Sequence, residues 1–245
     1  LQAALGRVLG ELYHEALVEA RRSGEKSWLE RRERELRAQY LEPATAALAQ
    51  ALSQRDALAL DSLEFIASLF DFYNGRYAEA DRQAQAALAA APWLSEAIKL
   101  RGEIAHAQAL RQFSQGKHDA ARALLGQAIE HFQHAADISR SDGQLQAVLA
   151  RAFMDLSEVD RLQGKPQDQA FAQALAAAER AITALPSDGS GYLERARVQL
   201  FIGQAAGRRK ADPVPSYNQS IASAEQALAR SPNDVIAWDT LGNAL

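Results

Sequence analysis

The sequence predicts an all-α protein, a right-handed α-solenoid built from antiparallel helix pairs. Three observations predict this fold class. Residues 61–94 place small, aromatic, glycine and proline residues at the spacing of one helix pair. The same pattern returns three times further along the chain, twice with insertions of equal length. A triplet of Trp238, Leu241 and Gly242 then begins a fifth copy.

The first helix pair is predicted over residues 61–94, with helices at about 62–73 and 77–90. Gly75 supplies the left-handed conformation that ends the first helix. Pro92 fixes the end of the second helix, because proline disfavours helical geometry at the residue before it. Two helices that pack within roughly 8 to 10 Å of each other need small residues where they touch. The four predicted pairs place buried alanines at these contacts, at Ala80, Ala87, Ala121, Ala128, Ala181 and Ala227.

The second and third pairs, residues 95–142 and 143–188, are predicted to have extended helices. Their turn glycines, Gly116 and Gly164, come 7 residues later in the repeat frame than Gly75 does in the first pair. Seven residues add about two helical turns, or about 10 Å. The equal length of the two insertions indicates that both pairs are extended in the same way.

A fourth pair is predicted over residues 189–234, with a loop insertion at 207–215, where glycine and two prolines favour irregular backbone. Residues 235–245 are predicted to be a truncated fifth repeat. A half-repeat leaves an apolar face uncovered, so the sequence is interpreted as part of a longer protein.

Residues 1–60 depart from the repeat but are helical by pattern, and they form either an N-terminal cap or a divergent repeat. Ser27 and Glu30 have the spacing of a capping box at the start of the second helix in this segment. Pro43 should kink or split that helix. Gly6 and Gly10 are interpreted as residues that allow close helix packing.

Composition is typical of a globular, cytoplasmic protein and argues against several functions. The chain has 48% hydrophobic and 24% charged residues, a net charge of -4 and no cysteine. The acidic balance gives no drive towards nucleic acid, and no apolar run is long enough for membrane insertion. The sequence contains no catalytic motif of a common enzyme class. His131 and His134 are two possible metal ligands, which is too few for a site. We therefore expect no catalytic, cofactor-binding or metal-binding residues.

Residues 61–94 resemble the tetratricopeptide repeat (TPR), which has a 34-residue period and a pattern of Trp, Leu-Gly, Tyr, Ala, Phe and Pro positions. The resemblance implies a scaffold that holds another protein, as a peptide or a helix, in a concave groove. It also assigns the groove positions of each repeat. In this sequence they include Phe65, Leu69, Phe72, Lys99, Glu103, His106, Arg151, Asp155, Arg197 and Phe201.

The groove residues leave two questions open. Phe65, Leu69 and Phe72 would form an apolar floor for a ligand, but aromatic residues such as Phe72 and Phe201 can equally pack against a neighbouring helix. Arg151 and Arg197 have no obvious acidic neighbour one turn away on the groove side, so they are the first candidates for contact with a partner.

Two other functions remain as alternatives. The segments PWLSEAIKLRGEI and ISRSDGQLQ more loosely resemble the TPR region that follows the catalytic domain in some bacterial serine/threonine kinases. That resemblance implies a non-catalytic regulatory or substrate-recruiting region of a signalling enzyme. RNA binding is a remote alternative, because helical-pair solenoids can bind RNA, but the acidic charge argues against it.

Overall fold

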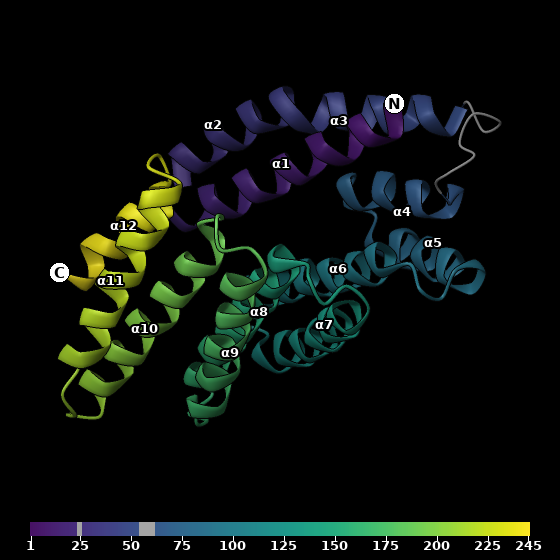
Figure 1. Ribbon diagram of the computed structural model, residues 1–245. Coiled ribbons are helices and arrows are strands. Elements are labelled where there is room, and N and C mark those ends of the chain that lie inside the picture. Colours follow the sequence, from purple (N-terminus) through teal and green to yellow (C-terminus); the bar gives the residue numbers. More distant parts are fainter. Residues whose placement is uncertain (24–25, 54–61) are drawn as a thin grey trace. The chain divides into compact units, whose positions relative to one another are not determined.

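The computed structural model describes residues 1–23, 26–53 and 62–245, and within these ranges it contains helices and no strand (Figure 1). The predicted all-α class is confirmed. The N-terminal helices are α1 (Gln2–Ser23), α2 (Lys26–Leu36) and α3 (Glu42–Ser53), with a π-helical segment at Arg37–Leu41. The helix pairs are α4 (Leu63–Tyr73) with α5 (Tyr77–Ala90), α6 (Ser95–Ser114) with α7 (His118–Ile138), α8 (Gly143–Leu162) with α9 (Asp168–Ala184), and α10 (Ser190–Arg208) with α11 (Val214–Arg230), followed by α12 (Val235–Ala244).

The first three pairs close through the same backbone turn. Gly75, Gly116 and Gly164 take left-handed conformations, with φ of 72°, 74° and 68°. The residue after each glycine donates its N–H to the carbonyl five positions earlier, at 2.9, 3.0 and 2.8 Å. This is the Schellman arrangement that satisfies the last carbonyls of a helix. The prediction that these three glycines are turn residues is confirmed.

The fourth pair differs from the prediction, because the loop predicted at 207–215 is longer than the one in the structure. Helix α10 continues through Arg208 and α11 begins at Val214. Lys210 takes the left-handed conformation, with φ of 58°, and the N–H of Ala211 reaches the carbonyl of Ala206 at 2.9 Å. A lysine therefore fills the position that glycine fills in the other turns. Pro215 lies in the first turn of α11, where a missing N–H costs nothing.

The predicted extension of the second and third pairs is confirmed, and the fourth pair shares it. Helices α4 and α5 have 11 and 14 residues. Helices α6 and α7 have 20 and 21 residues, and α8 and α9 have 20 and 17. Helices α10 and α11 have 19 and 17 residues, and each takes two residues from the segment that was predicted as a loop.

Small residues lie at the contacts within each pair. All six predicted contact alanines are buried, with at most 2% of their surface exposed. Buried serine hydroxyls join the two helices of a pair directly. Ser68 donates from α4 to the carbonyl of Ala80 on α5 at 2.6 Å, and Ser220 donates from α11 to the carbonyl of Ala196 on α10 at 2.8 Å. The repeat frame therefore predicted the packing faces correctly.

The N-terminal segment is helical as expected, and Pro43 interrupts it. Because proline has no N–H, the carbonyl four residues earlier loses its helical donor. The backbone adapts through the π-helical segment Arg37–Leu41, in which the N–H of Glu42 bonds to the carbonyl of Arg37. Ser27 lies inside α2, which begins at Lys26, and not before its first residue. The predicted capping box is not tested further, because the side chain of Ser27 lies outside the described part of the chain.

The glycines of α1 allow close packing, as predicted. A Cβ atom at Gly6 would lie 2.6 Å from Cγ of Leu48 on α3, and one at Gly10 would overlap the ring of Tyr73 on α4. Helix α1 can therefore lie against α3 and α4 only because both positions lack a side chain.

The chain forms two compact units, Leu1–Ile104 and Ala105–Leu245. The boundary falls inside α6, so it does not coincide with any boundary between the predicted repeats, and the division of the chain into repeats stays a prediction.

Among the described helices, none has both the length and the apolar character needed to cross a membrane.

Candidate partner-binding surface

Three of the predicted groove residues lie in the core of the N-terminal unit. Phe65, Leu69 and Phe72 are 4%, 6% and 5% exposed. The guanidinium carbon of Arg7, on α1, lies 5.4 Å from the ring centroid of Phe65. The ring of His14, also on α1, lies 5.6 Å from that of Phe72. The face of α4 that was expected to be open is thus covered by the N-terminal helix of the same chain, which favours the alternative of internal packing.

Lys99 and Glu103 also belong to the N-terminal unit. They lie one turn apart on α6 and form an ion pair with an N–O distance of 3.6 Å. Both side chains are partly exposed. An i, i+4 pair of this kind on a helix surface contributes only about 0.2 to 0.5 kcal/mol, so it leaves both groups able to exchange partners.

The C-terminal unit brings the remaining charged residues together across three helices. His106, on α6, is only 7% exposed, and its Nε2 lies 2.7 Å from Oδ2 of Asp155 on α8. Arg151 lies one turn before Asp155 on the same helix and reaches α10. Its Nε and Nη2 donate to Oε1 of Glu194 at 2.9 and 2.8 Å.

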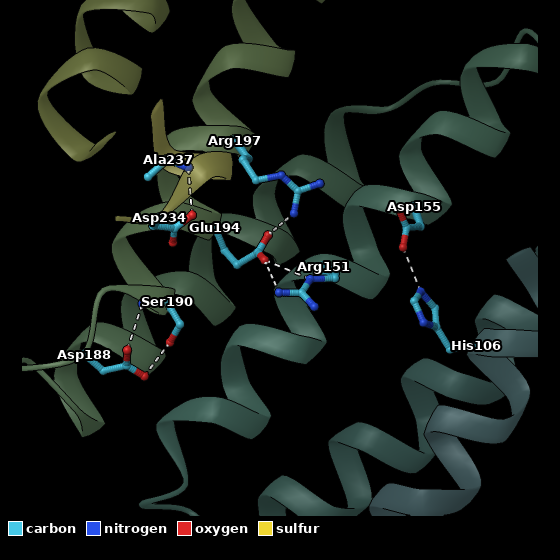
Figure 2. A network of polar contacts seen from close by, with 9 residues as sticks. All are labelled: His106, Arg151, Asp155, Asp188, Ser190, Glu194, Arg197, Asp234 and Ala237. Carbon is cyan, nitrogen blue, oxygen red and sulfur yellow. Dashed lines mark hydrogen bonds and ion pairs between the residues drawn. The ribbon is translucent and has the colours of Figure 1, made fainter. Parts of the chain in front are cut away.

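Glu194 joins the two predicted arginines (Figure 2). Its side chain is 0% exposed, and its second oxygen, Oε2, accepts from Nη1 of Arg197 at 2.7 Å. The expectation that Arg151 and Arg197 lack an acidic neighbour is therefore wrong. A carboxylate buried without counter-charge would cost several kcal/mol, and two guanidinium groups supply that counter-charge here.

We call these five residues the polar row: His106, Asp155, Arg151, Glu194 and Arg197. Sequence reasoning found four of them and missed Glu194. The signal that was available is its spacing from Arg197, because residues three apart lie on the same helix face. Phe201 lies one turn beyond Arg197 on α10 and is half-buried.

Aspartates accept hydrogen bonds at the starts of α8 and α10, two of the three helices that carry the row. Asp142 accepts from the N–H of Leu145 at 2.9 Å, which caps α8. Asp188 accepts from both the N–H and the hydroxyl of Ser190 at the start of α10, at 3.2 and 2.8 Å (Figure 2). Both aspartates satisfy N–H groups that the helix itself leaves unpaired, and Asp142 is the N-cap residue of α8.

The polar row presents charges rather than reactive groups. Glu194 pairs with Arg151 and Arg197, and Asp155 pairs with His106. The side chains of Arg151 and Asp155 are each 22% exposed, so part of both reaches the surface. Within residues 1–23, 26–53 and 62–245, no three His, Asp or Glu side chains are close enough to hold a metal ion. The arrangement suits hydrogen bonding to polar groups of another molecule.

Comparison with known proteins identifies the fold. No protein-family model matches the sequence, and no curated protein is significantly similar to it. Among solved structures, the chain is similar to TTC0263, a thermophilic TPR protein of Thermus thermophilus, with a TM-score of 0.59 and 16% identity over 84% of this chain and 90% of that one. It is also similar to the MamA protein, with a TM-score of 0.48 and 16% identity over 74% of this chain and 79% of that one. The similarity to TTC0263 extends over most of both chains.

Proposed function

From the tetratricopeptide-repeat fold of this chain, we propose that it is a non-catalytic protein-interaction scaffold. In this proposal the polar row on α6, α8 and α10 holds a peptide or a helix of a partner protein. The observation that carries it is the buried Glu194 with its two arginines, on first helices of successive pairs.

Burying charge between helices carries a cost in free energy. Replacing a buried ion pair by apolar residues is often neutral or stabilising, so pairing alone gives little reason to keep charges between helices. Charges that reach the surface select a partner, because like charges repel and opposite charges attract across an interface. Arg151 and Asp155 present opposite signs one turn apart on α8. A partner segment that carries both signs of charge fits such a row.

Photocrosslinking tests which face of the helix pairs meets the partner. Phe201 is replaced by the photoreactive residue benzoylphenylalanine, and Ala176, an exposed residue of α9, is replaced in a matched control. The purified chains are irradiated in lysate of the source cells. We expect one or a few proteins to be crosslinked from position 201 and not from position 176. Equal labelling from both positions, or none from 201 in a folded chain, would refute the proposal.

The cellular context also remains a proposal. The loose resemblance of PWLSEAIKLRGEI and ISRSDGQLQ to repeat regions of bacterial serine/threonine kinases is compatible with a scaffold that recruits substrates to a cytoplasmic signalling enzyme. Identification of the crosslinked partner distinguishes that setting from a free-standing scaffold.

A further inference from the structure

A buried imidazole lies beside one of the two charges that the polar row presents at the surface. The side chain of His106, on α6, is 9% exposed, and its Nε2 lies 2.7 Å from Oδ2 of Asp155 on α8 (Figure 2). The side chain of Asp155 is 22% exposed. The carboxylate therefore meets His106 on the inside and the surface on the outside.

The hydrogen bond determines which imidazole nitrogen gains or loses a proton. An ionised carboxylate only accepts hydrogen bonds, so Nε2 of His106 carries the hydrogen that is donated to Asp155. The proton that comes and goes with pH is then the one on Nδ1. Titration of His106 adds or removes one positive charge beside Asp155, and the hydrogen bond between α6 and α8 stays in place throughout.

The charged groups around His106 come from the helices that pack against α6 and from α6 itself. Within the C-terminal unit, α6 shares an apolar cluster with α7 and α8. Helix α8 contributes Asp155 and Arg151. On α6, Glu103 and Lys99 lie about one and two turns before the imidazole and pair with each other. The buried residues of α7 are apolar, and its three histidines are at least partly exposed.

The imidazole is the member of this set that changes its charge near neutral pH. Carboxylate, ammonium and guanidinium groups ordinarily keep their charge between pH 5 and 8, and histidine ordinarily does not. When His106 is neutral, Asp155 presents a negative charge at the surface of α8. When His106 is protonated, it forms an ion pair with Asp155, and a cation that approaches from the surface meets a pair without net charge.

The proton acts more strongly on the contact at Asp155 than on the contact at Arg151. His106 bonds directly to Asp155, whereas the guanidinium of Arg151 bonds to Glu194 on α10. Coulomb interactions weaken with distance and are screened less where groups are partly buried. A basic group of a partner at Asp155 therefore loses attraction when His106 is protonated, and an acidic group at Arg151 is affected less.

We propose that Asp155 binds a lysine or arginine of the partner segment, and that protonation of His106 weakens this contact. The partner is then held when His106 is neutral and released when it is protonated. This inference rests on the proposed function of the polar row, and it adds the sign of the charge that Asp155 recognises and a dependence on pH.

The first measurement uses the chain without a partner. The ring carbon resonances of His106 are followed by NMR between pH 5 and 8 and are assigned by their absence in His106→Gln. We expect them to report a change of charge within this range, while the amide resonances of α6 and α8 remain those of the folded chain. Ring resonances that do not change between pH 5 and 8 would overturn the proposal.

The second measurement is the dissociation constant of the protein that is crosslinked from position 201, at pH 5 and pH 8 and at constant ionic strength. We expect binding to be at least threefold weaker at pH 5. His134→Gln, at an exposed histidine of α7, is the matched control and should show the same ratio. His106→Gln and Asp155→Asn should each bring the two dissociation constants within twofold of each other, because each removes one member of the pair.

The outcomes separate this inference from the proposed function. If Asp155→Asn binds like the wild-type chain at both pH values, the polar row is not the binding surface, and both proposals fail. If Asp155→Asn weakens binding at pH 8 but His106→Gln keeps the wild-type ratio, the polar row binds the partner and the dependence on His106 is wrong. Tighter binding of the wild-type chain at pH 5 would also overturn the inference.

Discussion

At the scale of single residues, Glu194 supplies the counter-charge of Arg197 and also binds Arg151. Replacing Glu194 by Gln keeps the shape of the side chain and removes its charge. Breaking a buried ion pair from one side typically costs about 3 to 5 kcal/mol. We expect the free energy of unfolding, measured with urea, to fall by about that amount. Glu225→Gln, an exposed position on α11, is the control and should change it by less than about 0.5 kcal/mol. Equal losses in the two variants would contradict the role of Glu194.

The repeat frame makes a second prediction at this scale, for adjacent alanines of α5. Ala87 is fully buried against the neighbouring helix and Ala86 is exposed. Ala87→Leu should overpack the contact and cost about 1 to 3 kcal/mol, whereas Ala86→Leu should be close to neutral. Thermal unfolding of both variants measures the difference. If the two variants melt together, the assigned packing face is wrong.

The sequence predicted the buried residues that recur with the repeat. It did not predict the contacts between side chains that lie far apart along the chain. The buried alanines recur with the repeat, so their positions followed from spacing alone. The pairing of Arg151 with Glu194 joins residues on two helices, and their alignment depends on the exact lengths of α8, α9 and the turns between them. The burial of Phe65 and Phe72 depends on α1, a segment that does not follow the repeat.

At the scale of helices and turns, two glycines predict opposite effects of one substitution. Gly164 ends α8 with φ of 68°, and Gly126 lies inside α7; neither has an atom within 4 Å of an added Cβ. Gly164→Ala should cost about 1 to 2 kcal/mol, because an L-residue is strained in the left-handed conformation. Gly126→Ala should stabilise the chain by about 0.5 to 1 kcal/mol, because alanine is the better helix former. Urea unfolding measures both, and changes of the same sign would contradict the turn assignment.

The first turn of α4 predicts a pH dependence. The pKa of Glu64 is lowered from its ordinary value of 4.5, first by a hydrogen bond from its own backbone N–H and then by the Ser62 hydroxyl. That hydroxyl lies 2.8 Å from Oε2 of Glu64. A carboxylate with a lowered pKa stabilises the fold above its unfolded-state pKa, and the contribution is lost as pH falls through the folded-state pKa. Ser62→Ala should therefore raise the pKa of Glu64 in an NMR titration. An unchanged pKa would rule out the hydroxyl as a cause.

The turns also explain what the sequence could not predict at this scale. Three turns were recognisable because glycine is the residue that takes positive φ without strain. The fourth uses Lys210, and non-glycine residues with positive φ are uncommon, so the two prolines after it suggested a longer loop. Pro43 was recognisable because proline cannot donate the hydrogen bond that a helix needs.

At the scale of the whole molecule, the fold is determined by periodic features of the sequence, whereas the proposed binding surface is not periodic. Helix pairs follow from small residues, turn glycines and prolines, all of which repeat. The polar row occurs once, on α6, α8 and α10.

Binding of a partner segment at the polar row is tested most directly by the dissociation constant of the protein that is crosslinked from position 201. Asp155→Asn removes a partly exposed charge, and the amide oxygen can still accept the hydrogen bond from His106. We expect the variant to weaken binding about fivefold or more, which corresponds to about 1 kcal/mol. Glu225→Gln, exposed on α11, should leave affinity unchanged. Wild-type affinity in a folded Asp155→Asn chain would contradict the assignment of the polar row as the partner-binding surface.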